Sequence, residues 1–262
     1  MALFQCNFFA ETLGYCTSVQ VLLPYGNHSW DSNRDFHKLY PRHQHFRTLY
    51  LLHGMYEDET TWIRRSNIER YAAARQIAVV FPAAQNSYYT DMCCGQDYFT
   101  YLTEELPAFV QATFPLSGQR EDTFIAGLSM GGYGACKAAL KKPELYAAFA
   151  SLSGALDIGA VADYISNEFE YKTFTGVFGP PQKARGGPDD LFHLISKVDP
   201  AALPRAYFAC GTEDELCYSM NQRFLKCMNQ YQIEYTYEEG PGTHNWTFWD
   251  LYIQRALDWM LS

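Results

Sequence analysis

One segment of the chain, residues 123–134 (Thr-Phe-Ile-Ala-Gly-Leu-Ser-Met-Gly-Gly-Tyr-Gly), constrains the fold more than any other. A short apolar, strand-like run leads into a G-x-S-x-G pattern centred on Ser129, and a segment compatible with a helix follows at once. A serine on so tight a turn has a strained backbone, and side chains two residues before or after it would collide, which explains Gly127 and Gly131. The pattern predicts that Ser129 Oγ projects above a sheet edge, facing the positive end of the next helix. An ordinary turn is the alternative, but the flanking strand and helix favour a nucleophile.

The composition is that of a globular chain with one large α/β domain or two small ones. Of the 262 residues, 48% are apolar and 19% are charged, which is ample for a sizeable core. The net charge is −9 without any basic cluster, which argues against nucleic acid and membrane surfaces as partners. There is no bilayer-spanning apolar run and no lysine or arginine before Arg34, so we expect a cytoplasmic protein without a secretion signal.

The eight cysteines include no C-x-x-C pair, so the spacing typical of a metal site is absent. A disulfide framework is not expected in a chain without an export signal. The adjacent pair Cys93 and Cys94 is interpreted as two ordinary reduced thiols.

Short apolar strands alternate with helical patterns, which predicts a mostly parallel sheet covered by helices on both faces. Strands are expected at 17–23, 47–53, 77–81, 123–126, 149–153, 206–210 and 233–237. Helices are expected at 66–75, 97–114, 130–141 and 246–261. Residues 25–46 are interpreted as a loop or hairpin connection. Residues 157–200, which include a Gly/Pro-rich run, are predicted to be a small cap-like insertion over the C-terminal edge of the sheet in a single domain, 1–262.

A serine nucleophile needs a base, and in this fold class the order along the chain is Ser, then Asp or Glu, then His. Two histidines follow Ser129, namely His193 and His244. His193 lies in an apolar helical stretch of the predicted insertion, where a structural or surface role is favoured. His244 lies in a glycine-rich loop between the last strand and the last helix, which is where the fold delivers its base.

The acid that orients the histidine should follow the strand at 206–210, where Glu213, Asp214 and Glu215 compete. The pattern Gly-Thr-x-Asp favours Asp214, because the glycine turn lets a short carboxylate reach back toward His244. The two glutamates are more simply interpreted as solvated loop charges.

The oxyanion that forms on attack needs two hydrogen-bond donors. The backbone N–H of Met130, directly after the serine, is one candidate. The N–H of Met55, after a turn allowed by Gly54, is the other, although that turn could also be a plain strand end. Gly54 and Trp246 are predicted to contact the substrate, and bulky side chains around the donors predict a shallow pocket for short acyl groups. No metal or other cofactor is expected, since no carboxylate or cysteine cluster accompanies the loop histidines His28, His37, His43 and His45.

Together these motifs resemble those of the esterase D-like α/β-hydrolases. Within that family the chain looks most similar to the bacterial tributyrin esterases, which are relatives of S-formylglutathione hydrolase and of feruloyl and acetyl-xylan esterases. The matching pieces are Leu51–Met55, Tyr89–Met92, Glu104–Pro107, Gly127–Gly132, Ser151–Gly154, Gly211–Asp214 and Thr243–Trp249. The resemblance runs from about residue 15 to the C-terminus, with each catalytic piece in order, and departs mainly in 157–200. It implies an α/β-hydrolase fold, no cofactor, and hydrolysis of short-acyl esters.

Carried over residue by residue, the resemblance implies Ser129 as nucleophile, Asp214 as acid, His244 as base, and Met55 and Met130 as oxyanion donors. The sequence therefore predicts a serine carboxylesterase that works through an acyl-enzyme on a small-molecule ester. The alternatives with the same machinery are an S-acyl glutathione thioesterase, a feruloyl or acetyl-sugar esterase, and an acyltransferase. The alternative from another class is a non-catalytic relative that only binds ligands. A homo-oligomeric state is left open.

Overall fold

The computed structural model describes residues 1–25, 35–40 and 44–262, and of Lys38 and Leu39 only the backbone. Its centre is an eight-stranded sheet with the order β1-β2-β4-β3-β5-β6-β7-β8. The strands are β1 (Ala2–Ala10), β2 (Tyr15–Leu23), β3 (Thr48–Leu52), β4 (Ala78–Pro82), β5 (Thr123–Leu128), β6 (Ala148–Leu152), β7 (Arg205–Gly211) and β8 (Thr236–Gly240). All neighbours from β4 to β8 pair in parallel, while β1 with β2 and β2 with β4 pair antiparallel. The predicted mostly parallel sheet is confirmed.

The central strands are buried on both faces. Every residue of β3, β4, β5 and β6 is buried, as expected for parallel strands covered on two sides. Successive side chains alternate between two cores. Tyr50 and Leu52 face one apolar cluster, and Leu49 and Leu51 face the other.

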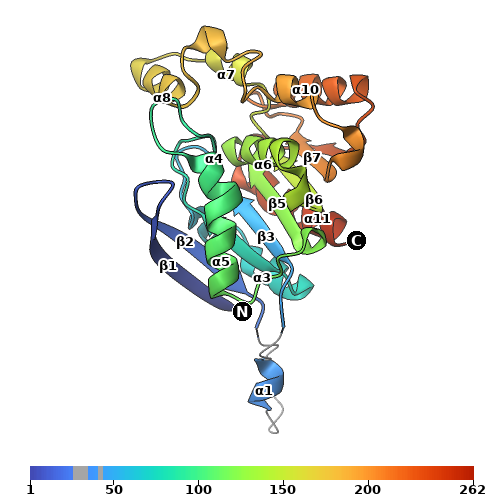
Figure 1. Cartoon of the computed structure of the whole chain (residues 1–262). Helices are drawn as coiled ribbons and strands as arrows, with labels where there is room; N and C mark the ends of the chain where they lie inside the picture. Colours follow the sequence, from blue (N-terminus) through green and yellow to red (C-terminus); the bar gives the residue numbers. More distant parts are fainter. Residues whose placement is uncertain (26–34, 41–43) are drawn as a thin grey trace.

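Helices cover both faces of the sheet (Figure 1). One core packs against α5 (Leu106–Thr113), α6 (Met130–Lys141) and α10 (Tyr218–Gln230). The other packs against α2 (Thr61–Arg65), α3 (Ile68–Arg75) and α11 (Trp246–Leu261). The helix expected over 97–114 consists of α4 (Tyr98–Thr100), a π-helical stretch (Tyr101–Glu105) and α5. This α/β-hydrolase arrangement places the C-terminal ends of the parallel strands at one edge.

Three α-helices lie between β6 and β7 in the chain. They are α7 (Ile158–Asp163), α8 (Glu168–Phe178) and α9 (Leu191–Ile195), and a 3-10 helix (Pro181–Lys183) lies between α8 and α9. Figure 1 shows α7 and α8 above the edge of the sheet where the parallel strands end. Asn167 caps the N-terminus of α8, because its side chain accepts a hydrogen bond from the Glu170 N–H at 3.0 Å. This part of the chain is attached to α6, since Lys137 Nζ lies 3.3 Å from Asp189 Oδ1 and Tyr133 Oη donates to Asp189 O at 2.7 Å.

Several elements differ from the sequence-based expectation, among them the short helix α2, which was not predicted. The edge strand β1 was not predicted, because exposed apolar residues such as Leu3 and Phe9 obscure its pattern. The strand predicted at 233–237 is instead Thr236–Gly240, a half-buried edge strand that contains two glutamates. The helix α10 was also not predicted. Of the connection predicted at 25–46, the described part includes the short helix α1 (Phe36–Leu39), while His28 and His43 lie outside the described residues.

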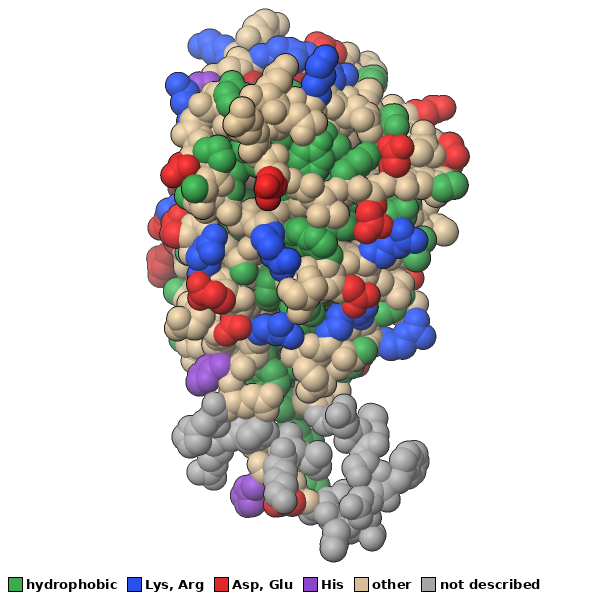
Figure 2. All heavy atoms as spheres, turned by 90° about the vertical axis from the view of Figure 1, so that its right-hand side faces the viewer, with side chains coloured by type: hydrophobic (Ala, Val, Ile, Leu, Met, Phe, Trp, Pro, Cys, Tyr) green, Lys and Arg blue, Asp and Glu red, His purple; other side chains and the backbone are tan. Residues whose placement is uncertain are grey.

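The surface drawn in Figure 2 carries basic and acidic side chains side by side, with apolar patches between them. Among the described residues, no helix is both long enough and apolar enough to cross a membrane.

Candidate active site

Ser129 lies on the sharp turn between β5 and α6. Its backbone has φ +52° and ψ −116°, a conformation that a non-glycine residue adopts only when the surrounding structure enforces it. The two flanking glycines explain how the turn closes. A Cβ on Gly127 would lie 2.4 Å from the backbone of Gly131, and a Cβ on Gly131 would lie 2.5 Å from Leu52 O. The turn therefore has no room for a side chain at either position, as the G-x-S-x-G pattern predicts.

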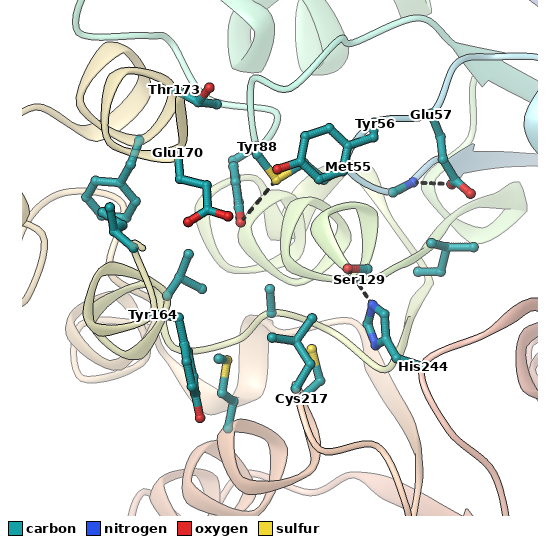
Figure 3. A pocket seen from close by; sticks show the side chains of 18 of the residues that line it. Met55, Tyr56, Glu57, Tyr88, Ser129, Tyr164, Glu170, Thr173, Cys217 and His244 are labelled. Carbon is teal, nitrogen blue, oxygen red and sulfur yellow. Dashed lines mark hydrogen bonds between the residues drawn. The ribbon is translucent and has the colours of Figure 1, made fainter. Parts of the chain in front are cut away.

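A hydrogen-bonded chain links three side chains from three different loops. His244 Nε2 is 3.0 Å from Ser129 Oγ, and His244 Nδ1 is 2.9 Å from Asp214 Oδ2. Figure 3 shows the imidazole turned toward the serine across the floor of the cavity. Ser129 follows β5, Asp214 follows β7, and His244 lies between β8 and α11. The carboxyl ends of these parallel strands bring together residues that are 30 to 115 positions apart in the chain.

The structure places Asp214 against the histidine and both competing glutamates elsewhere. Asp214 is buried and also accepts the Cys217 N–H at 2.9 Å. Glu213 is exposed, and its carboxylate accepts the Gly242 N–H at 2.7 Å. Burial raises the pKa of Asp214, but the hydrogen bond and charge of His244 and the Cys217 N–H outweigh burial, so the pKa lies below its ordinary value. Asp214 is therefore ionised at neutral pH.

The backbone N–H groups of Met55 and Met130 donate to no acceptor in the described part of the chain. Met130 is the first residue of α6, where helix amides lack intrahelical partners. Met55 follows β3, whose end lies beside β5 in the sheet. The neighbouring amide of Gly54 is used, since it donates to Glu57 Oε2 at 2.9 Å. Of these two neighbouring amides, only that of Met55 lacks an acceptor within the described residues.

His53 holds the turn that carries Met55. Its Nε2 accepts the Ala84 N–H at 3.1 Å, so its ring proton is on Nδ1, which donates to Gly54 O at 2.8 Å. Burial lowers the pKa of His53 below its ordinary value, and the ring is neutral. The sequence analysis included His53 only in the motif Leu51–Met55 and did not predict that it holds this turn. The signal for that role was a histidine at the end of a buried strand, directly before a glycine.

The serine opens into a cavity of about 350 Å³ with mostly apolar walls. Gly54, Met55, Leu128, Cys217 and Met220 are among the residues that line it. The segment between β6 and β7 supplies the opposite wall, with Val161, Tyr164, Ile165, Glu170, Thr173 and Phe174.

The position of Trp246 differs from the sequence-based expectation that it contacts the substrate. The lining residue is Trp249, one helical turn later. The ring of Trp246 packs edge-on against Trp62 and Trp249, and its Nε1 donates to Glu57 Oε1 at 3.0 Å. Trp246 therefore does not line the cavity itself, but it holds Glu57, which does. Gly54 does line the cavity. The side chain of Met130 is fully buried, and Met130 is absent from the cavity wall.

In the described part of the chain, the one grouping of metal-ligand side chains is Asp214, Cys217 and His244, with ligand atoms within 4.8 Å of one another. Both nitrogens of His244 already face hydrogen-bond partners, and burial raises the pKa of the Cys217 thiol well above its ordinary value. These contacts favour a hydrogen-bonded site over a metal centre. The expectation of no metal stays a prediction.

The strand order, the strained serine turn and the hydrogen-bonded histidine together define an α/β-hydrolase. The model of the family named Esterase, with the description "Putative esterase", matches residues 11–260, and the chain belongs to this family. It is an ester-hydrolysing enzyme.

Similar proteins agree with this assignment over the whole chain. An acetyl esterase of Caldicellulosiruptor saccharolyticus is 32% identical over 99% of this chain and 98% of its own length. A substrate-bound structure of fluorophosphonate-binding serine hydrolase F (FphF) of Staphylococcus aureus is 33% identical, with TM-score 0.88, and covers 100% of this chain and 98% of its own. The S-formylglutathione hydrolase FrmB of the same organism is 32% identical, with TM-score 0.84, and covers 100% and 99%.

Proposed function

We propose that the chain is a serine carboxylesterase whose nucleophile is Ser129, with His244 as base and Asp214 as orienting acid. The observation that carries the proposal is the continuous hydrogen-bonded chain from Ser129 Oγ through both nitrogens of His244 to Asp214. A serine hydroxyl is a weak nucleophile at neutral pH, and a histidine within hydrogen-bond distance can take its proton as it attacks.

In the acylation step, Ser129 Oγ forms a bond to the ester carbonyl carbon while its proton moves to His244 Nε2. The carbonyl oxygen becomes an oxyanion, which accepts hydrogen bonds from the N–H groups of Met55 and Met130. His244 then gives the proton to the leaving alkoxide as the carbon–oxygen bond breaks. Asp214 keeps the ring proton on Nδ1 and stabilises the charged imidazolium.

In the deacylation step, water enters where the alcohol has left. His244 takes a proton from this water as it attacks the acyl carbon, and the same two amides stabilise the second oxyanion. Collapse of the intermediate returns the proton to Ser129 Oγ and releases the acid. The cycle needs only side chains and amides of this chain.

We infer that the preferred acyl groups are short. The acetyl esterase that is 32% identical over the full length supports this, and so does the bulky Met55 side chain in the wall of the cavity. Each methylene that finds no apolar wall loses about 0.8 kcal/mol of transfer free energy. The test is kcat/KM for acetyl, butyryl, hexanoyl and octanoyl esters of one alcohol. A value that keeps rising through octanoyl contradicts a short-acyl preference.

A thioesterase acting on S-acyl glutathione is the second candidate, supported by the 32% identity to S-formylglutathione hydrolase FrmB. The oxygen ester and thioester of the same acyl group separate the two, because acylation is the only step in which their leaving groups differ. A thioester kcat/KM far above that of the matched ester favours the second candidate. A feruloyl or acetyl-sugar esterase and an acyltransferase are tested in the same assay with those acyl donors and with added alcohol acceptors.

Replacing Ser129 by alanine tests the nucleophile. We expect kcat to fall on the order of 10⁴–10⁶-fold, with loss of labelling by a fluorophosphonate probe and an unchanged thermal unfolding midpoint. The side chain lies at the cavity and not in the core, so folding should be unaffected. Activity within about tenfold of the parent contradicts the assignment, and a parent protein that neither labels nor turns over any ester supports the non-catalytic alternative.

We also propose a reducing, cytoplasmic location. All eight cysteines are free in the structure, including the exposed pair Cys93 and Cys94, and such thiols persist where the redox environment keeps them reduced. Fractionation of the native cells followed by detection of the protein tests this location.

A further inference from the structure

The wall of the cavity opposite Ser129 carries a negative charge and aromatic rings. Among the described residues that line the cavity, the carboxylates are Glu57 and Glu170, and there is no lysine or arginine. The carboxylate of Glu57 is engaged, because its two oxygens accept from Gly54 N and Trp246 Nε1. The carboxylate of Glu170 is the other negative charge, and it faces the cavity (Figure 3).

The start of α8 holds Glu170 in place. Ser166 donates to Glu170 Oε2 twice, from its amide at 2.8 Å and from its hydroxyl at 3.0 Å. These hydrogen bonds lower the pKa of Glu170 below its ordinary value, so the group is ionised at neutral pH. Figure 3 shows its carboxylate directed into the cavity, on the side away from Ser129 and His244.

Aromatic residues from three segments line the same cavity as this charge. Tyr56 comes from the turn after β3 and stacks on Phe169, which precedes Glu170 in α8, with ring centroids 6.3 Å apart. The charge of Glu170 contributes to a raised pKa of Tyr56, after burial, which places the two groups near one another. Tyr164, after α7, also lines the cavity, on the side away from Ser129 and His244 (Figure 3).

Tyr88 is the third aromatic residue and is buried with its hydroxyl toward the cavity (Figure 3). The hydrogen-bond partner of that hydroxyl within the described chain is a thioether, Met55 Sδ, at 3.9 Å, which is a weak acceptor. The backbone of Tyr88 has φ +52°, and Tyr133 and Phe178 fix its ring edge-on at 5.6 and 5.2 Å. Tyr88 is therefore a rigid part of the cavity wall, and its hydroxyl has only a weak hydrogen-bond partner there.

We propose that the Glu170 end of the cavity is a binding subsite for a cationic group of the ester, of the quaternary-ammonium class. A carboxylate attracts the positive charge, and tyrosine ring faces attract a poorly hydrated cation through their quadrupole. An anionic group would meet the charge of Glu170 without any lysine or arginine in the described cavity wall to balance it. The apolar walls between Glu170 and Ser129 suit the methylenes that join the cation to the reacting carbonyl. This subsite rests on the proposed function, since it assumes that the ester reacts at Ser129.

Isosteric substrates test the subsite. Choline butyrate and its uncharged isostere, with carbon in place of the quaternary nitrogen, have nearly the same shape and differ in charge. The methyl ester of γ-trimethylammoniobutyric acid and its carbon isostere place the same difference on the acyl side. We expect the ratio of kcat/KM, charged over uncharged, to fall about five- to tenfold in Glu170→Gln for the pair whose cation enters the subsite. Comparing ratios cancels the different intrinsic reactivities of the esters.

Two features of the design keep the result specific. The side chain introduced by Glu170→Gln still has an oxygen to accept from Ser166, as glutamine does at this helix position, so α8 should remain folded. Glu168→Gln is the matched control, because it removes a charge from the same helix where Glu168 pairs with Lys172 at the exposed surface, and its ratio should equal that of the parent. A ratio that is the same in the parent and Glu170→Gln for both pairs overturns the subsite, and so does an equal fall in Glu168→Gln.

Binding to the Ser129→Ala protein separates failure of the subsite from failure of the proposed function. Calorimetric affinities for choline butyrate and its isostere need no turnover. A preference for the charged ester that Glu170→Gln removes supports the subsite even if neither ester is hydrolysed. Equal affinities in the presence of normal hydrolysis by the parent overturn the subsite and leave the esterase standing.

Discussion

The two walls of the cavity are built in different ways. The wall with Ser129 consists of turns at the ends of buried parallel strands, where backbone atoms pack against one another without space for a Cβ. The wall with Glu170 consists of short helices between β6 and β7, with helix caps and partly exposed side chains. The first wall has no room for added side-chain atoms at Gly127 and Gly131, while the second consists of side chains that a substitution can change. This division suits a common reaction with variable specificity.

The first prediction concerns the strand-end wall and has the largest effect. Asp214→Asn should lower kcat roughly 10²–10⁴-fold, because an amide cannot keep the Nδ1 proton in place or stabilise the imidazolium. Glu213→Gln is the matched control and should be nearly silent, since a glutamine oxygen can still accept the Gly242 N–H. Steady-state kinetics on one ester measure both. A damaging Glu213→Gln with a mild Asp214→Asn would mean that the acid is misassigned.

The second prediction tests how tightly the strand-end wall is packed. Gly131→Ala should destabilise the protein by about 3 kcal/mol, near the upper part of the range for overpacking, because its Cβ meets two backbone carbonyls, Leu52 O at 2.5 Å and His53 O at 2.7 Å. Backbone atoms in a buried sheet cannot turn aside as side chains do. The free energy of unfolding in urea measures the change. A loss below about 0.5 kcal/mol, the size of an ordinary surface change, would contradict this packing.

The third prediction concerns the link between the two walls. Burial lowers the pKa of Lys137 to about 8, in spite of the nearby charge of Asp189. Below that pH the folded protein bears the cost of a buried charge, and this cost disappears as the pH rises from about 8 toward the unfolded value of 10.5. The stability of the parent relative to Lys137→Met should therefore increase by about 2 kcal/mol between pH 7 and pH 10.

Urea unfolding of both proteins at the two pH values measures this difference, and subtraction removes the titration of all groups that they share. A difference that is flat with pH, or one that decreases toward pH 10, would contradict the lowered pKa of Lys137.

Sequence patterns predicted the strand-end wall much better than the helical one. The order of strands and helices, Gly127 and Gly131 around Ser129, and the loops carrying Asp214 and His244 follow from local rules, because each residue acts at the end of its own element. The side chains that face the cavity from the helical wall and from the other elements around it are set by tertiary packing. Nothing local indicated that Trp249 and not Trp246 would face the cavity, that Tyr88 would enter from the loop after β4, or that Glu170 would point inward from α8.

The last prediction makes the same chemical change as the second, in the other wall, and has the smallest effect. Gly176 lies inside α8, and a Cβ there would meet only Cys94 O, at 3.9 Å. Gly176→Ala should stabilise the protein by about 0.5–1 kcal/mol, because alanine loses less conformational entropy in a helix. The hydrogen bond from Cys94 N to Gly176 O at 2.8 Å involves only backbone and should persist, so kcat/KM for a short ester should not change. The free energies of unfolding of Gly176→Ala and Gly131→Ala in urea, measured side by side, test this prediction. If both variants are destabilised, α8 is packed as tightly as the serine turn and the prediction is wrong.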